Sequence, residues 1–264
     1  MAANVLCFDI ETVPDVVSGR RLLGLPELAD GQVAELLGQR QRERTGSDFL
    51  RHHLQRVVAI SVAMRLTNGQ FLLRSVGDLE TDEAELIRRF YAGIERYTPV
   101  LVSWNGGGFD LPVLHYRSLL HGICAARYWE LGEDDNSFRY NNYLGRFHWR
   151  HLDLMDVLAG YQLRAAAPLQ EVALMLGLPG KLGLDGAQVW ESFQAGALET
   201  IRHYCDTDVL NTYLIYLRFE LVRGHLDERQ YRDEVIRVRD FLAAAEAPHL
   251  GEFLRAWDAA AASA

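Results

Sequence analysis

An apolar strand that ends in two carboxylates dominates the N-terminal part of the chain. The segment 4–12 reads NVLCFDIET, so its strand-forming residues run directly into Asp9 and Glu11. Residues two apart on a strand share a face, and these two side chains therefore project together. Neighbouring buried carboxylates repel each other unless they share a proton or bind a cation. The segment predicts either a site for a hard divalent ion such as Mg²⁺ or Mn²⁺, or a strand that ends in a polar turn.

Length and composition are those of a globular chain with one large α/β domain or two small ones. The 264 residues contain no apolar run of membrane-spanning length and no secretory signal at the start. Three scattered cysteines, Cys7, Cys124 and Cys205, indicate reduced thiols, a cytoplasmic location and no zinc site. A net charge of −9 argues against a protein that coats duplex nucleic acid, but it permits an enzyme that meets phosphates through metal ions.

Hydrophobic periodicity predicts strands and helices along the rest of the chain. Asn68 and Gly69 give the turn signal of a β-hairpin. The polar region 15–56 is expected to hold a short helix within 22–37, and the tail 226–264 is expected to be helical with a frayed Ala-rich end. The further predicted strands are 57–66, 71–76, 99–103 and 149–154, and the further predicted helices are 82–97, 112–120, 154–162, 169–176 and 197–219.

Two segments each have two interpretations. Residues 39–56 carry five arginines against Glu43 and Asp48, so they form either a flap that meets a phosphate backbone or a solvated helix face. Residues 128–149 hold seven aromatic residues with arginines among them, which suits either stacking of unpaired bases or a twisted hairpin of paired aromatics. Asp153 follows this segment and is expected to cap the next helix.

A glycine-rich turn after the strand at 99–103 introduces a third carboxylate. The segment 104–112 contains three consecutive glycines, which let the backbone turn sharply and approach a ligand, and Asp110 then opens a helix. No phosphate-loop or dinucleotide-binding pattern accompanies the glycines, so nucleotide binding of those kinds is not expected. Taken alone, Asp110 is either a helix cap or a ligand.

The long helix predicted at 197–219 supplies a fourth carboxylate. Tyr204 and Asp208 lie four residues apart and therefore share a face of that helix. In the loop before it, Lys181 either neutralises a phosphate or faces water.

The three segments FDIET, NGGGFD and YCDTD together resemble the three exonuclease motifs of the DEDD superfamily of 3′–5′ exonucleases. The resemblance runs from residue 4 to residue 219. The chain most resembles the proofreading exonuclease domain of B-family DNA polymerases. In detail it resembles stand-alone predicted exonucleases related to that domain. This resemblance implies an α/β, ribonuclease H-like fold with a central mixed five-stranded sheet, order 3-2-1-4-5, flanked by helices. The exonuclease domain would span 1–225, with 226–264 as a C-terminal helical extension of the same domain.

The resemblance assigns catalytic and metal-binding roles to four carboxylates. Asp9 would bridge two divalent cations, Mg²⁺ or Mn²⁺, with Glu11 and Asp208 on one ion and Asp110 on the other. Two such ions can activate a water molecule and stabilise the leaving 3′ oxygen of a phosphodiester. Tyr204 would orient the attacking water as a further catalytic residue.

The resemblance also implies contacts with a single-stranded 3′ end, of DNA more than of RNA. Thr12 and Asn105 would contact the terminal nucleotide, Phe109 would pack or act as a wedge, and Lys181 is a candidate phosphate contact. The remaining residues leave no room for a polymerase palm and fingers, so any proofreading would occur in trans, with a polymerase or repair partner that the sequence does not identify. No membrane association is expected. The alternatives are an exoribonuclease that trims RNA 3′ ends and a catalytically silent nucleic-acid-binding module.

His203 raises a question about the class within the superfamily. Its two classes carry Y-x-x-x-D and H-x-x-x-x-D, and Tyr204 and His203 satisfy one pattern each. In a continuous helix, four residues place Tyr204 only about 40° from Asp208, whereas five place His203 about 140° away. The helix geometry predicts the tyrosine class, with His203 as a neighbour.

Overall fold

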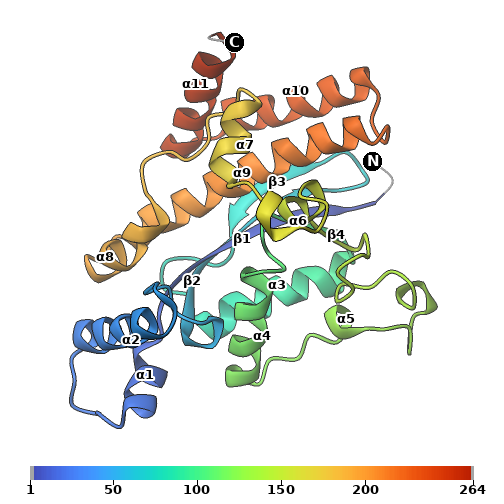
Figure 1. Ribbon diagram of the computed structural model, residues 1–264. Coiled ribbons are helices and arrows are strands. Elements are labelled where there is room, and N and C mark those ends of the chain that lie inside the picture. The colour runs from blue at the N-terminus through green and yellow to red at the C-terminus, as the bar shows by residue number, and fades with distance from the viewer. Residues whose placement is uncertain (1–2, 263–264) are drawn as a thin grey trace.

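The computed structural model of this chain describes residues 3–262, with a five-stranded mixed sheet between two layers of helices (Figure 1). The order is β3-β2-β1-β4-β5, in which β1 is antiparallel to β2 and parallel to β4. The predicted α/β, ribonuclease H-like arrangement is therefore confirmed. The strands are β1 (Val5–Pro14), β2 (Gln55–Arg65), β3 (Phe71–Ser75), β4 (Val100–Ser103) and β5 (His151–Asp153).

Strand β1 occupies the middle of the sheet because its side chains are apolar toward both helical layers. Val5 and Cys7 join the core that includes α9 (Leu198–Val222), whereas Leu6 and Phe8 join the core that includes α3 (Glu83–Tyr97) and α4 (Asp110–His121). The pairing of β1 with β2 shifts register between Glu11 and Thr12. This irregularity lies at the end of the apolar run, where the two predicted carboxylates project.

The connection between β1 and β2 contains two helices, α1 (Val16–Leu23) and α2 (Asp30–Thr45), followed by the short helix η1 (His52–Leu54). The helix predicted within 22–37 is present as α2, but it is longer than predicted and continues to Thr45, and α1 before it was not predicted. Gly24 ends α1 in the left-handed conformation with φ 67°, where a residue without Cβ is favoured.

The remaining helices cover the sheet or connect its strands. In Figure 1, α9 and α10 lie on one side of the sheet, and α3 and α4 lie on the other. The further elements are α5 (Ala126–Trp129), η2 (Asn136–Phe138), α6 (Leu154–Leu158), η3 (Leu163–Ala165), α7 (Leu169–Met175), η4 (Gly186–Gln188), α8 (Val189–Gln194), α10 (Glu228–Ala244) and α11 (Pro248–Ala262).

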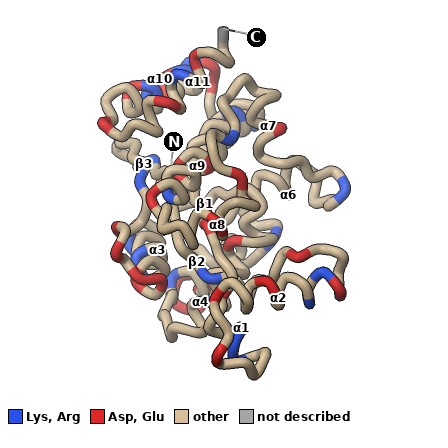
Figure 2. The backbone as a smooth tube through the Cα atoms, turned by 90° about the vertical axis from the view of Figure 1, so that its left-hand side faces the viewer, with Lys and Arg blue, Asp and Glu red and all other residues tan. Residues whose placement is uncertain are grey.

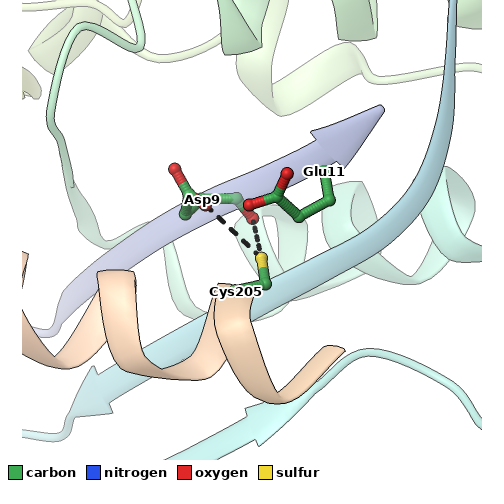
Figure 3. A group of neighbouring side chains, drawn as sticks. All are labelled: Asp9, Glu11 and Cys205. Atoms are coloured by element: carbon green, nitrogen blue, oxygen red, sulfur yellow. Dashed lines mark hydrogen bonds between the residues drawn. The ribbon is translucent and has the colours of Figure 1, made fainter. Parts of the chain in front are cut away.

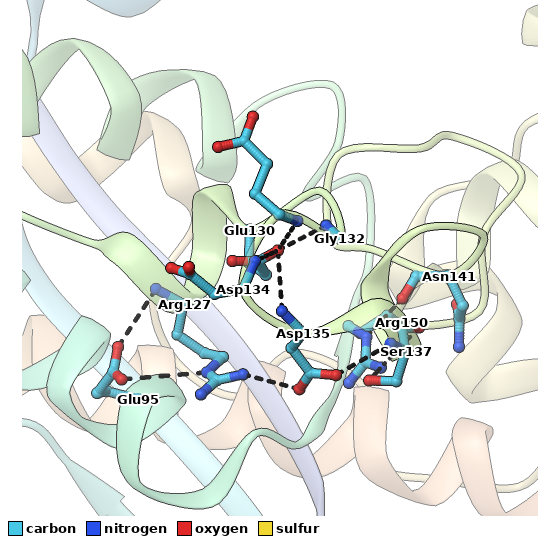
Figure 4. A network of polar contacts seen from close by, with 10 residues as sticks. Glu95, Arg127, Glu130, Gly132, Asp134, Asp135, Ser137, Asn141 and Arg150 are labelled. Atoms are coloured by element: carbon cyan, nitrogen blue, oxygen red, sulfur yellow. Dashed lines mark hydrogen bonds and ion pairs between the residues drawn. The ribbon is translucent and has the colours of Figure 1, made fainter.

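The segment 128–149 does not form the twisted hairpin that was one of its two interpretations. It contains the end of α5, η2 and a series of turns, held by side chains that bond the backbone (Figure 4). One carboxylate oxygen of Glu130 accepts the backbone N–H of Gly132 at 2.6 Å, and Arg127 pairs with Asp135. Because such side chains supply the hydrogen bonds that strand pairing would make, the segment stays irregular.

Several aromatic residues of this segment are buried. Tyr128, Phe138 and Tyr143 join the core beneath α3, and the guanidinium of Arg150 lies 3.8 Å from the ring centroid of Phe138. Tyr140 and others remain exposed. Stacking of unpaired bases on this segment therefore stays a prediction, restricted to its exposed rings.

The C-terminal helix α11 packs one face against the core that includes α9. Phe253 is fully buried, and Trp257 and Leu250 are buried beside it in the core that includes α9. The helical character predicted for the tail is confirmed over 228–244 and 248–262. Fraying of its Ala-rich end stays a prediction, and residues 263–264 lie outside the described part. The assignment of the tail to the same domain stays a prediction. Among the described residues, no helix is both long and apolar enough to cross a membrane.

Candidate active site

Asp9 and Glu11 lie side by side in the middle of β1 and face α9 (Figure 3). Cys205 of α9 reaches toward them, with its Sγ 3.4 Å from the backbone oxygen of Asp9 and 3.5 Å from Asp9 Oδ2. One potential ligand atom from each of the three residues lies within 4.8 Å of the others. The structure therefore gathers two oxygen donors and one sulfur donor at one point.

Asp110 reaches the same place from the other side of the sheet. The glycine turn that precedes it is tight, because a Cβ on Gly106 would lie 2.3 Å from Ser103 Oγ, and Asn105 adopts a left-handed φ of 63°. This turn starts α4 at Asp110, whose Oδ1 accepts the backbone N–H of Ile10 at 3.1 Å. The third predicted carboxylate is thereby fixed against β1 and buried.

Helix α9 presents Tyr204 and Asp208 from one buried face. The ammonium of Lys181 lies 5.3 Å from the ring centroid of Tyr204. Asp208 Oδ1 is buried and has no hydrogen-bond partner among the described residues. A buried carboxylate oxygen without a partner is costly, and a bound cation would satisfy it.

The electrostatics of the four carboxylates indicate that the site needs positive charge. Burial, followed by repulsion from neighbouring carboxylates, raises the pKa of Asp9 and of Glu11 well above the ordinary values. Burial likewise raises the pKa of Asp110 to about 7, and that of Asp208 to about 6 although Lys181 opposes the shift. Four such groups cannot all ionise cheaply at neutral pH without a cation. The donor set, which is rich in carboxylate oxygen, fits a divalent ion.

A cavity of about 1040 Å³ opens from these carboxylates toward α2. Thr12, Asn105 and Phe109 line it, and their contact with a substrate stays a prediction. Thr12 Oγ1 also donates a hydrogen bond to Gln55 Oε1 at 3.0 Å. Lys181 does not line this cavity and lies against Tyr204 instead.

The sequence interpretation missed several aromatic residues of the cavity wall, among them Phe49 and His52. Their rings lie 5.4 Å and 5.7 Å from the ring of Phe109, and 60% of Phe49 is exposed. The sequence signal that could have identified Phe49 is the presence of an aromatic residue within the basic segment 39–56. In that segment Arg42 pairs with Asp48, and Figure 2 shows acidic and basic positions interspersed on α2.

Asp153 has a second structural role besides the predicted helix cap. It caps α6 through the backbone N–H of Asp156, which confirms the prediction. Its two oxygens also accept the backbone N–H groups of Asn105 and Gly107, both at 2.9 Å. Asp153 therefore holds the glycine turn that delivers Asp110.

His203 lies away from the carboxylates. Its ring stacks on His249 of α11, with centroids 3.8 Å apart and an interplanar angle of 15°, and it does not line the cavity. This is the side of α9 that the helix geometry predicts for a residue five positions before Asp208.

The fold and the carboxylate cluster define an α/β protein of the ribonuclease H-like class. The chain belongs to the family described as "Predicted 3'-5' exonuclease related to the exonuclease domain of PolB", which matches residues 47–257. Asp110, Tyr204 and Asp208 lie within the matched segment, whereas Asp9 and Glu11 precede it.

Several curated relatives are DNA polymerases. The chain is 23% identical over 226 residues to the catalytic subunit of DNA polymerase epsilon from Schizosaccharomyces pombe, a match that covers 82% of this chain and 9% of that protein. It is 25% identical over 187 residues to a DNA polymerase of Archaeoglobus fulgidus, a match that covers 66% of this chain and 23% of that protein. The chain is 27% identical over 143 residues to the catalytic subunit of DNA polymerase epsilon from Dictyostelium discoideum, a match that covers 53% of this chain and 6% of that protein. The chain thus spans less than a quarter of each of these relatives.

Proposed function

We propose that this chain is a metal-dependent 3′–5′ exonuclease that removes nucleotides from single-stranded 3′ ends, with DNA preferred over RNA. The observation that carries the proposal is the convergence of Asp9, Glu11, Asp110 and Asp208, from three separate elements, on a single cavity. The family to which the chain belongs supports hydrolysis in the 3′–5′ direction. The named relatives are DNA polymerases, which favours DNA as the polymer.

The four carboxylates are the proposed ligands of two divalent cations, Mg²⁺ or Mn²⁺, with Asp9 contributing to both. The unpartnered Oδ1 of Asp208 and the raised pKa values of the cluster support this assignment. When bound, such ions supply Lewis-acid stabilisation of charge on the phosphate and lower the pKa of a water molecule.

Tyr204 is the proposed residue that orients the attacking water. Burial and the carboxylates of Asp208 and Glu11 raise the pKa of its phenol, so it stays protonated at neutral pH. A protonated phenol can hold a water oxygen by donating a hydrogen bond, and it is not a general base. This role agrees with the tyrosine class, and His203 takes no part in it.

The cavity wall supports a single-stranded substrate. Phe109 and Phe49 present rings beside the carboxylates, and aromatic rings stack on unpaired bases of any sequence. Thr12 and Asn105 are the proposed contacts to the terminal nucleotide, because both line the same cavity as these rings and the carboxylates. Lys181 is proposed to act on the site through charge, not as a cavity-wall contact.

A degradation assay tests the proposal. DNA and RNA oligonucleotides of one sequence, labelled at the 5′ end, are incubated with the protein in Mg²⁺, in Mn²⁺ and in chelator. A metal-dependent ladder that shortens from the 3′ end, faster on DNA, is expected, and Asp9→Ala should abolish it. Asp134→Ala, which removes an exposed acid of the segment 128–149, is the control and should behave as wild type. A faster ladder on RNA supports the exoribonuclease, and binding without cleavage under every metal supports the silent module.

A further inference from the structure

A cavity of about 490 Å³ lies between the edge strand β3 and helix α3, and it shares no lining residue with the cavity of the carboxylates. Its floor is apolar and is built by β1, β2, β3 and α3, with Leu6, Val62, Met64, Leu72 and Phe90 among its residues. The proposed function makes no use of this cavity, which is named the β3–α3 groove below.

Three exposed arginines surround the β3–α3 groove, Arg74 from β3 and Arg89 and Arg96 from α3. Arg89 shares the carboxylate of Glu85 with Arg88, whereas Arg74 and Arg96 form no ion pair with another described residue. Two guanidinium groups therefore remain available at the rim of an apolar cavity, in a chain whose net charge is −9. Such a rim attracts a ligand that combines negative charge with an apolar group.

Gly93 widens the groove in the interior of α3. Glycine destabilises a helix interior relative to alanine, and a Cβ added to Gly93 would meet no atom within 4 Å. Packing within the described chain therefore does not require a glycine at this position. Arg89, Gly93 and Arg96 are spaced four and three residues apart, so they share a face of α3. The helix thus presents bare backbone between two positive charges, which lets another chain approach closely.

The edge of β3 offers the hydrogen bonds that an extended chain needs. Among the described residues, β3 pairs with β2 alone. The oxygen of Gln70 and the N–H of Val76 bond toward β2, and backbone direction alternates along a strand, so the backbone groups of residues 71, 73 and 75 point to the open side. The side chains of Leu72 and Arg74 line the groove beside this edge. A peptide paired there would carry alternate side chains into the groove.

We propose that the β3–α3 groove binds an extended acidic segment of a partner protein, one that carries a large apolar side chain between its carboxylates. The segment adds a strand to the edge of β3, its apolar side chain fills the cavity beside Gly93, and its carboxylates pair with Arg74 and Arg96. Asp78 is the one acid among the described lining residues, and it accepts a hydrogen bond from the hydroxyl of Thr81 at 2.7 Å. The rim therefore keeps an excess of positive charge, which selects an acidic partner.

The features of the groove favour a peptide over a nucleic acid. The edge of a strand pairs with the N–H and C=O groups of a peptide backbone, which a nucleic acid lacks, and the apolar floor fits a hydrocarbon side chain. A nucleic acid would use the arginines alone. The inference concerns a surface other than the carboxylate site and does not rest on exonuclease activity.

Fluorescence anisotropy with a labelled synthetic peptide tests the groove on the full chain. The peptide alternates aspartate with valine and carries one central phenylalanine. One reference peptide has lysine in place of aspartate, and another has serine in place of phenylalanine. The variants are Arg74→Glu, Arg96→Glu and Gly93→Leu. The control is Arg88→Glu, which makes the same charge change on α3 outside the lining of the groove.

The acidic peptide should bind, with an affinity that falls as the salt concentration rises, and the lysine peptide should not bind. Arg74→Glu and Arg96→Glu should each weaken binding at least about tenfold, because each removes a hydrogen bond between charged groups. Gly93→Leu should weaken it at least about tenfold by filling the space of the phenylalanine, and the serine peptide should lose a similar factor. Arg88→Glu should change the Kd less than about threefold. Thermal unfolding checks that each variant is folded, and Gly93→Leu should not lower the midpoint, since leucine is the better helix former.

Absence of binding would overturn the inference, as would binding that Gly93→Leu leaves unchanged. Displacement of the peptide by a single-stranded oligonucleotide, with loss of oligonucleotide binding in Arg74→Glu, would assign the groove to nucleic acid instead. Self-association that competes with the peptide in sedimentation would assign it to a second copy of the chain. A chain that binds the peptide but cleaves no nucleic acid contradicts only the proposed function, and a chain that cleaves but does not bind the peptide contradicts only the groove.

Discussion

The carboxylate of Asp110 accepts the backbone N–H of Ile10 at 3.1 Å, although the two residues are 100 positions apart in the chain. Ile10 lies between Asp9 and Glu11 on β1, so this one bond fixes the start of α4 against the strand that carries the other two carboxylates. Asp110 therefore combines a structural bond with its proposed role as a metal ligand, and the two can be separated by substitution.

Asp110→Asn is expected to separate stability from activity. The asparagine Oδ1 can accept the same bond from Ile10, so the thermal midpoint should stay near that of wild type. The substitution removes the negative charge that the proposed metal ions need, and stabilisation by such ions amounts to several kcal/mol. Exonuclease turnover should therefore fall at least about a hundredfold. Equal loss of stability and activity, measured by thermal unfolding and by the ladder assay, would contradict this separation.

Tyr204→Phe and His203→Ala distinguish the tyrosine class from the histidine class. Removal of one positioned hydrogen-bond donor from an active site costs about 10²- to 10³-fold in kcat. We expect that loss for Tyr204→Phe, with KM little changed, because the hydroxyl would act on water and not on the nucleotide. His203→Ala loses the stacking on His249 but should retain kcat within about threefold. A dependence on His203 in place of Tyr204, in steady-state kinetics, would reverse the class.

The sequence could predict the parts of this protein in which local periodicity coincides with tertiary position. The two-residue period of a strand places Asp9 beside Glu11, and the 3.6-residue period of a helix places Tyr204 beside Asp208 and turns His203 away. The sheet order followed from the resemblance of three motifs and is confirmed.

Features that depend on contacts distant in sequence could not be predicted in the same way. Cys205 faces Asp9 only because α9 crosses β1, and Phe49 meets Phe109 only because the irregular region after α2 folds back over the glycine turn. The hairpin considered for 128–149 failed for a related reason. Its aromatic pattern suited strands, but side chains such as Glu130 bond the local backbone and hold it in turns.

Phe49→Ala is expected to weaken substrate binding with little effect on chemistry. Stacking of one base on an aromatic ring contributes about 1–3 kcal/mol. KM for a single-stranded oligonucleotide should therefore rise about tenfold, whereas kcat should change little, since Phe49 supplies no metal ligand. Tyr140→Ala removes another exposed ring, from the segment 128–149, and serves as the control. An equal rise in KM for both variants would show that bases also stack on the segment 128–149.

Phe253→Ala tests whether the tail 226–264 belongs to the same cooperative unit as the sheet. Truncation of a fully buried phenylalanine costs about 3–5 kcal/mol. If the tail and the sheet unfold together, the single urea transition should move to a lower midpoint with no change in slope. Val222→Ala, at an exposed position of α9, should leave the midpoint unchanged. A separate early transition in Phe253→Ala would show that the tail is an independent unit.

The acid dependence of stability should originate in part from Asp15. Burial raises the pKa of Asp15, but hydrogen bonds from Ser18 and the ion pair with Arg117 outweigh it and lower the pKa below its ordinary value. A group with a lowered folded-state pKa contributes stability above its unfolded-state pKa, near 4, and that contribution is lost as the pH falls through the folded-state value. The free energy of unfolding should therefore fall steeply below about pH 4.

Asp15→Asn isolates this contribution, because asparagine is as good a helix cap as aspartate and can still accept the bond from Ser18. Urea unfolding measured from pH 6 to pH 2 should give a shallower decline for the variant than for wild type. Glu234→Gln should act in the same direction, because the folded-state pKa of Glu234 is also lowered. Burial raises this pKa, but the hydrogen bonds from Arg65 outweigh the effect of burial. The two sites belong to different clusters, so the double variant should show the sum of both effects. An unchanged acid slope in Asp15→Asn would exclude its buried ion pair as a source of the pH dependence.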